Sequence, residues 1–226
     1  MKYLIRMNKN TNLRIAWLLF VVVAFFSCKD NTETADPYAD WQVRNEHYLD
    51  SIVHVARNVP EGEKWEIYRN YKLNFEGAGG NGITQVPPTL YEYDSVYVKI
   101  ITQGTGAVAV GSTDTAYVCY QGFLMNGTRF DGNYVGTFDP KVNVPSNLKS
   151  NISNFIAGWT TALLYMKAGT FAELYIPYQM AYGTNGYGSS IPGYSVLKFE
   201  LYLDRIVHPI GPDDRSLKRQ EVETSK

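Results

Sequence analysis

The stretch "FIAGWTTALLYM", residues 155–166, is the one segment in the C-terminal half of the chain that repeats with a helical period. Ile156, Trp159, Leu163 and Met166 share one face of that helix. The sequence around it instead alternates as strands do, over residues 95–101, 114–124, 170–177 and 195–206. Strands, one helix and strands again predict an α+β fold, in which the helix lies on an antiparallel sheet.

The composition indicates a globular protein. The chain has 226 residues, of which 45% are hydrophobic and 19% are charged, and this balance excludes a disordered chain. The 18 tyrosines favour strands and surfaces lined with aromatic rings. The formal net charge is −1, and no basic stripe with interleaved aromatic residues occurs, so we expect no nucleic acid partner.

The N-terminus is typical of an exported protein. Lys2, Arg6, Lys9 and Arg14 precede an apolar run over residues 15–26, as in a secretory signal. The run is shorter than the ~20 residues of a membrane-spanning helix. It ends in "FFSC", which resembles the lipobox of a bacterial lipoprotein. We therefore predict a signal peptide over 1–27 and a lipid on Cys28 that anchors the chain to a membrane. The alternative is an ordinary signal peptide with an incidental cysteine.

The sequence after Cys28 divides into four further parts. We expect a polar tether over 28–36, a helical segment and linker over 37–90, a folded domain over 91–208 and a polar tail over 209–226. Asp36 and Pro37 indicate the start of an amphipathic helix over about 37–57, with Trp41, Tyr48, Ile52 and Val55 at roughly helical spacing.

Only two cysteines occur in the chain, and we expect no disulfide. Cys28 would carry the lipid, and Cys119 is then left without a partner. Cys119 lies in "TAYVCY", which indicates a small buried residue on a strand rather than a nucleophile.

No motif for a cofactor or a metal has the context that it needs. "GAGGNG", residues 77–82, fits a dinucleotide-binding fingerprint, but "ITQVPP" follows it and cannot open a helix. His47 and His54 lie seven residues apart, which is too far for one metal without further ligands. We therefore expect neither a cofactor nor a metal.

Four ordered blocks carry a resemblance to a known family. They are "YVCYQGFLMNGTRFDG" (117–132), "NFIAGWTTAL" (154–163), "YIPYQMAYG" (175–183) and "SSIPGYSVLKFE" (189–200). Together they resemble the signature blocks of the FKBP-type peptidyl-prolyl isomerases over about residues 91–206. With the lipobox and the N-terminal helix, the chain is similar to FKBP-type lipoproteins of Bacteroidota. The resemblance implies a curved antiparallel sheet wrapped round one short helix.

The resemblance also implies an active site in the hollow between helix and sheet. Trp159 would be its floor, Tyr182 would lie on the loop above it and Asp131 at its edge, accepting a hydrogen bond from the Tyr120 hydroxyl. The backbone N–H of Ile156, at the start of the helix, would be free to hold a substrate carbonyl. The expected walls are Tyr120, Phe130, Phe155, Ile191 and Phe199, with Tyr187 on the rim. Phe138 and Val142 are both open as candidates for a remaining wall.

The implied activity needs no nucleophile, because isomerisation of an X-Pro amide makes and breaks no bond. The first hypothesis is therefore a prolyl isomerase that acts on proline-containing, partly folded proteins of the bacterial cell envelope, on the periplasmic or the surface face of the outer membrane. The alternative is a non-catalytic peptide-binding module or an accessory subunit of an outer-membrane assembly. Trp41 and Trp65, which lie outside the isomerase half, favour that alternative.

Overall fold

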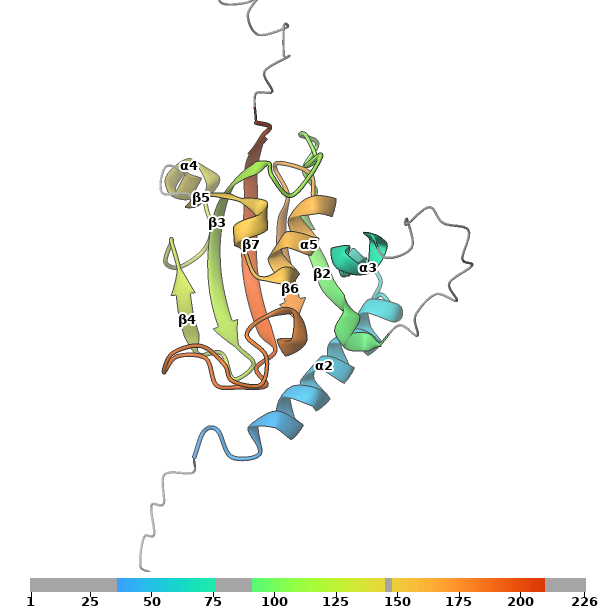
Figure 1. Ribbon diagram of the computed structural model, residues 1–226, viewed down its shortest axis with the longest axis vertical. Coiled ribbons are helices and arrows are strands. Elements are labelled where there is room, and N and C mark those ends of the chain that lie inside the picture. The colour runs from blue at the N-terminus through green and yellow to red at the C-terminus, as the bar shows by residue number, and fades with distance from the viewer. Residues whose placement is uncertain (1–35, 76–90, 145–147, 210–226) are drawn as a thin grey trace, which may run out of the picture. The chain divides into compact units, whose positions relative to one another are not determined.

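A computed structural model describes residues 36–75, 91–144 and 148–209 (Figure 1). The expected signal peptide with Cys28, most of the tether, the "GAGGNG" stretch and residues 210–226 of the tail lie outside these residues. Within them, none of the helices combines the length and the apolar character needed to cross a membrane.

One antiparallel sheet contains all seven described strands, in the spatial order β1-β2-β6-β7-β3-β4, with β5 paired to β3. The strands that alternation predicted are confirmed as β2, β3, β6 and β7. The strand bounds are β1 Trp65–Arg69, β2 Ser95–Thr102, β3 Thr115–Leu124, β4 Arg129–Gly132, β5 Leu148–Asn151, β6 Phe171–Ile176 and β7 Leu197–Val207.

The helices are short except for the first one described. In Figure 1 α5 crosses in front of the sheet, and the fold class expected from the sequence, a short helix on a curved antiparallel sheet, is confirmed. The helices are α2 Trp41–Arg57, α3 Tyr71–Phe75, α4 Pro140–Asn143 and α5 Ala157–Tyr165, with 3-10 turns η1 Glu92–Asp94, η3 Ile152–Asn154 and η4 Tyr178–Met180.

The helix α5 lies close to the sheet because its second residue has no side chain. A Cβ added to Gly158 would overlap the side chain of Ile176, which is fully buried on β6. Trp159 and Leu163 follow on the same helix and belong to the main hydrophobic core. The position of α5 on the sheet, and hence of Trp159, depends on this glycine.

The segment before residue 91 contributes to the same sheet. β1 pairs along β2 over five residues, from Trp65↔Lys99 to Arg69↔Ser95. α2 packs on the sheet through Leu49, Val53 and Ala56. The described residues from Asp40 onward belong to one compact unit, and the expected boundary between 90 and 91 falls at the edge of a segment outside the described residues.

The expected start and face of α2 are wrong in detail. Asp36 does not cap the helix, because its carboxylate accepts the backbone N–H of Tyr38 and forms a turn. The helix begins at Trp41, and its fully buried face runs through Trp41, Asn45, Leu49, Val53 and Ala56. Tyr48, Ile52 and Val55 lie beside that stripe and are half-buried.

We predict that Gly158→Ala destabilises the fold. The overlap with Ile176 outweighs the gain in helix propensity of about 1 kcal/mol, and overpacking of a core costs about 1–3 kcal/mol. Chemical denaturation followed by circular dichroism measures the change in the free energy of unfolding.

Gly111→Ala is the matched control, because the nearest atom to its added Cβ is Thr113 Oγ1 at 4.0 Å. We expect its stability to match that of the unmodified chain. The double variant Gly158→Ala/Ile176→Ala should lose less stability than the two single losses summed, since the second change removes the overlap. Additive losses would show that the close approach of α5 to β6 is not the cause.

Candidate active site

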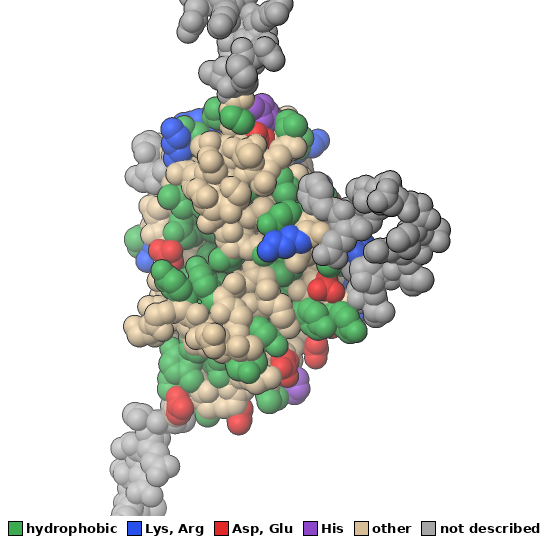
Figure 2. Space-filling view, viewed as in Figure 1, with side chains coloured by type: hydrophobic (Ala, Val, Ile, Leu, Met, Phe, Trp, Pro, Cys, Tyr) green, Lys and Arg blue, Asp and Glu red, His purple; other side chains and the backbone are tan. Residues whose placement is uncertain are grey.

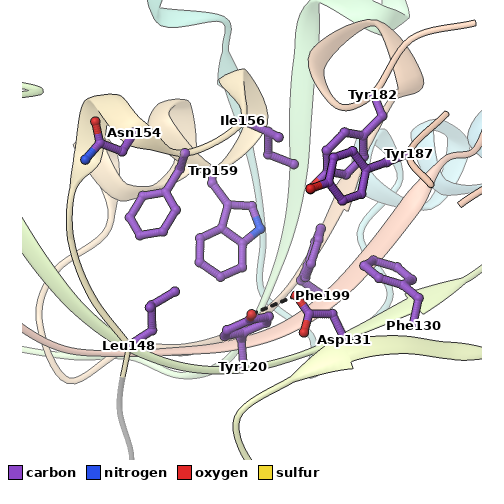
Figure 3. A pocket seen from close by; sticks show the side chains of 11 residues that line it. Tyr120, Phe130, Asp131, Leu148, Asn154, Ile156, Trp159, Tyr182, Tyr187 and Phe199 are labelled. Carbon is purple, nitrogen blue, oxygen red and sulfur yellow. Dashed lines mark hydrogen bonds between the residues drawn. The ribbon is translucent and has the colours of Figure 1, made fainter. Parts of the chain in front are cut away.

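A pocket opens between the start of α5 and the strands beneath it. Its cavity volume is about 270 Å³, near the lower end of the range for small-ligand sites. Figure 2 shows hydrophobic side chains gathered on this face on the side of β4 and β5, with few charged side chains among them. The lining residues, most of them labelled in Figure 3, are Tyr120, Phe130, Asp131, Leu148, Asn154, Phe155, Ile156, Trp159, Tyr182, Tyr187 and Phe199.

The indole of Trp159 forms the base of the pocket and is 4% exposed. Tyr120 from β3 and Phe199 from β7 meet it edge-on, with ring centroids at 4.9 Å and 5.1 Å. The Phe155 ring is tilted against the indole, at a centroid distance of 5.0 Å. The edge-to-face contacts of Tyr120 and Phe199 with the indole are favourable, because the positive edge of one ring meets the negative face of the other. The base is thus held by rings from two strands and from the residues just before α5.

A glycine makes room for the wall on the strand side. Gly122 lies opposite Phe199 in the β3–β7 ladder and opposite Asp131 in the β3–β4 ladder. A Cβ at this position would come within 2.6 Å of the Phe130 ring and 2.8 Å of the Phe199 ring. Because this Cβ is missing, Phe130 and Phe199 can pack edge-to-face at 5.6 Å.

A polar pair lies at the edge of the pocket. The Tyr120 hydroxyl donates a hydrogen bond of 2.8 Å to Asp131 (dashed in Figure 3). Burial raises the pKa of Tyr120, and the hydrogen bond to Asp131 raises that pKa further. The phenol therefore remains a donor at neutral pH and holds the ring beside Trp159.

A free backbone donor lies at the start of α5. Ile156 is the N-cap residue, and among the described residues its N–H has no acceptor. The preceding turn is fixed by Thr160, whose hydroxyl donates to the Ile152 carbonyl at 2.9 Å. Since Ile156 lines the pocket, this N–H can serve a carbonyl group of a ligand.

The loop between β6 and β7 brings two stacked tyrosines to the pocket. The rings of Tyr182 and Tyr187 lie 4.9 Å apart at an angle of 27° (Figure 3). Burial raises the pKa of Tyr182, and the nearby Tyr187 and Asp131 add to the rise. The Tyr182 hydroxyl is therefore protonated at neutral pH, and it is a second donor beside the pocket.

The structure brings nine of the ten residues expected at the site to one pocket. The exception is Ile191, which is 4% exposed in the same hydrophobic core but is not among the residues that line the pocket. Neither Phe138 nor Val142 lines the pocket. Phe138 stacks on Phe171 on the outer face of the sheet, at a centroid distance of 4.9 Å.

Sequence reasoning missed two lining residues, Leu148 and Asn154. Both lie near the end of a long connection, in β5 and η3. The pairing of β5 with β3 brings them to the pocket. This pairing runs from Thr115↔Asn151 to Val118↔Leu148. The sequence of this connection has no clear period, so no pattern in it pointed to them.

Groups for covalent or metal chemistry do not gather at the site. Within residues 36–75, 91–144 and 148–209, no three His, Cys, Asp or Glu side chains are grouped so as to hold a metal ion. Cys119 is fully buried on β3, and burial raises the pKa of its thiol to about 11. The pocket instead offers rings, two tyrosine hydroxyls, a carboxylate and a backbone N–H.

Two comparisons of the sequence with known proteins agree on one family. The model of the family "FKBP-type peptidyl-prolyl cis-trans isomerase" matches residues 106–204. An "FK506-binding protein" of Neisseria meningitidis is 32% identical over 112 residues, which are 50% of this chain and 96% of that protein. The "Outer membrane protein MIP" of Legionella longbeachae is 38% identical over 105 residues, 46% of this chain and 41% of that protein.

A solved structure of a peptidyl-prolyl cis-trans isomerase from Pseudomonas syringae is similar in fold. It superposes with a TM-score of 0.51 at 21% identity and covers 76% of this chain and 98% of that one. The chain spans about half the length of several of the curated relatives that it matches.

We predict that Tyr120 ionises late in an alkaline titration. Its pKa is raised above the ordinary value of about 10, so its proton leaves at a higher pH than that of an exposed tyrosine. The phenolate absorbance of the chain and of Tyr120→Phe, recorded against pH, should differ only in the late part of the curve.

Tyr117 on the same strand is the matched control. Its hydrogen bond with Lys149 lowers its pKa, as does the Arg205 guanidinium over its ring, so Tyr117→Phe should remove an early component. If Tyr120→Phe removes an early component instead, the hydroxyl is not buried against Asp131 as described.

Proposed function

The chain belongs to the family of FKBP-type peptidyl-prolyl cis-trans isomerases, and from this we propose that its pocket catalyses the cis-trans isomerisation of X-Pro peptide bonds. The observation that carries the proposal is the base of the pocket. Trp159 lies there under an open cavity, surrounded by Tyr120, Phe155 and Phe199. A flat apolar ring of this kind offers a proline ring a surface on which to stack.

Rotation about the X-Pro bond costs ~18–20 kcal/mol because the amide resonance must be broken. No covalent bond forms, so the protein has only to bind the twisted amide more tightly than the planar one. The twisted amide is less polar than the planar one. A pocket of aromatic carbons that excludes water therefore favours the twisted form, by a desolvation effect.

Two donors orient the substrate in this proposal. The Ile156 N–H donates a hydrogen bond to a carbonyl of the peptide at the start of α5, and the Tyr182 hydroxyl donates to a second carbonyl from the loop side. With both donors fixed on the protein, the substrate is held while the prolyl bond turns. Asp131 acts through Tyr120, which it holds against Trp159.

We propose further that the protein works in a bacterial cell envelope, on proline-containing proteins that are unfolded or partly folded. The basic start, the apolar run over 15–26 and Cys28 support export and lipid attachment. One relative bears the name of an outer membrane protein, which supports the same compartment. An anchored isomerase would act on chains that fold close to that membrane.

We predict that Tyr182→Phe lowers kcat/KM on a proline-containing peptide about fivefold to tenfold. The change removes one hydroxyl donor and keeps the ring, and one oriented hydrogen bond contributes about 1 kcal/mol or slightly more. A protease-free isomerisation assay measures the rate.

Tyr165→Phe is the control, because Tyr165 lies at the far end of α5 and stacks on Tyr68. It should retain the full rate. A wild-type rate equal to the uncatalysed rate, with peptide binding still visible by calorimetry, would replace the enzymatic proposal by the peptide-binding module.

We predict that the full chain fractionates with membranes in a Gram-negative host and that Cys28→Ser moves it to the soluble fraction. In this proposal the lipid is attached through a thioether bond to the Cys28 sulfur, and serine cannot form that bond. Incorporation of a labelled fatty acid measures the modification directly.

Cys119→Ser is the matched cysteine control, since Cys119 is buried on β3, and labelling of this variant should be unchanged. A Cys28→Ser protein that still carries label and stays with membranes contradicts lipid attachment at this position.

A further inference from the structure

The loop between β6 and β7 is folded tightly on itself. Tyr187 and Ile191 exchange two backbone hydrogen bonds, of 2.8 Å and 3.2 Å. The Tyr194 N–H donates to the Gly183 carbonyl at 3.0 Å, and the Gly183 N–H donates to the Tyr178 carbonyl at 2.8 Å. Backbone hydrogen bonds therefore link the part of the loop that holds Tyr182 and Tyr187 to its C-terminal end.

The glycines of this loop serve close packing of the backbone. A Cβ on Gly186 would overlap the Ile191 carbonyl, and one on Gly193 would overlap the Thr184 carbonyl. Tyr194 has a φ of 61°, which is strained for a residue with a side chain. Such a conformation persists only where the surroundings fix it, so the residues that hold the C-terminal end of the loop matter.

That end is held by α2. The Trp41 Nε1–H donates to Ser195 Oγ at 2.9 Å, and the Ser195 hydroxyl donates to the Pro192 carbonyl at 2.6 Å. The side-chain oxygen Oδ1 of Asn45 accepts the Val196 N–H at 2.8 Å. In Figure 1 the N-terminal part of α2 runs beside this loop.

The residues that form these hydrogen bonds are shielded from water. Asn45 is fully buried, Ser195 is 3% exposed and Trp41 is 7% exposed. The ladder of β7 with β3 and β6 begins at Leu197, so the Val196 N–H has no strand partner and depends on Asn45. A buried N–H without an acceptor is costly, and this cost ties the end of the loop to α2.

A short path leads from these bonds to the pocket. Pro192 directly follows Ile191, whose side chain is buried in the core. Ile191 is bonded through its backbone to Tyr187, and the Tyr187 ring stacks on Tyr182 in the pocket lining. Each link in this path is a covalent bond, a pair of hydrogen bonds or a ring stack.

We infer that Trp41 and Asn45 are positioning residues for the pocket. They hold Ser195 and Val196 so that the loop keeps Tyr182 and Tyr187 over Trp159. A donor that binds substrate has to be held within a fraction of an ångström by the residues behind it. The kinetic part of this inference rests on the proposed isomerase function, whereas its structural part does not.

The test compares Trp41→Phe and Asn45→Ala with the unmodified full chain. Each variant removes one bond to the loop. We expect exchange of the Tyr187, Ile191 and Tyr194 amide hydrogens to speed up about tenfold. We also expect kcat/KM to fall about threefold to tenfold, mainly through KM, because a looser loop binds the peptide less tightly.

Ser195→Ala tests the hydrogen bond between Trp41 and Ser195 from the acceptor side. Since Trp41→Phe and Ser195→Ala both break the bond between the indole and the hydroxyl, the double variant should be no slower than the worse single variant. Both substitutions are small. We therefore expect at least one of the two single variants to keep its fold, so that its amide exchange and kcat/KM can be measured.

Val53→Ala is the matched control on the same helix. Val53 is 2% exposed and belongs to the cluster with Tyr97 and Tyr175, and its side chain makes no hydrogen bond. The variant should lose stability while amide exchange in the loop and kcat/KM remain at the wild-type values.

Two results overturn the inference. In the first, Trp41→Phe and Asn45→Ala lower the melting temperature as Val53→Ala does, yet leave amide exchange in the loop unchanged. In the second, exchange accelerates but kcat/KM stays the same. A wild-type chain without isomerase activity counts against the proposed function alone. Amide exchange, together with binding of a proline peptide measured by calorimetry, then decides this inference.

Discussion

The contact of Trp159 with the rings around it is the interaction on which the rest of the pocket depends. Its place is set from below by Gly158, which lets α5 approach Ile176 on the sheet. It is set from the sides by Tyr120 and Phe199, which meet the indole edge-on. Gly122 leaves the space in which the next ring, Phe130, packs. Two positions without a side chain thus decide where the aromatic side chains lie.

Two of the polar groups of the site are fixed by side-chain hydrogen bonds. Asp131 holds the Tyr120 hydroxyl, and Thr160 holds the turn that presents the Ile156 N–H. One polar atom has no such partner, because the Trp159 Nε1 is buried without an acceptor in the described part of the chain. An orphaned donor of this kind costs about 1–3 kcal/mol. The protein tolerates that cost at the base of the site, where the apolar face of the indole is exposed to the cavity.

The sequence predicted the central elements well and the peripheral ones less well, for physical reasons. Alternation found the four long strands, because half of their side chains lie in the core. Four ordered motifs placed most of the site, because each fixes a ring against a glycine or a turn. The short β1, with the mixed sequence "WEIYR", gave no alternation to detect. Asn45 hid the true face of α2, since hydrophobic patterning cannot predict a fully buried amide.

The long connection before α5 was the other gap. Leu148 and Asn154 reach the pocket through the pairing of β5 with β3, and a four-residue strand has too little sequence to reveal its register. Ile191 was expected in the wall of the cavity, but it is 4% exposed in the core and is not among the lining residues.

The pairing of β1 with β2 limits how far this protein can be shortened. The family match begins at residue 106, but β2 lies before that residue and β1 forms the outer edge beside it. A fragment cut at the start of the match would lose both strands and leave the backbone of β6 open along one side. An uncovered strand edge recruits other chains into intermolecular sheets. The minimal unit for expression, crystallisation or transfer into a fusion protein therefore begins no later than β1.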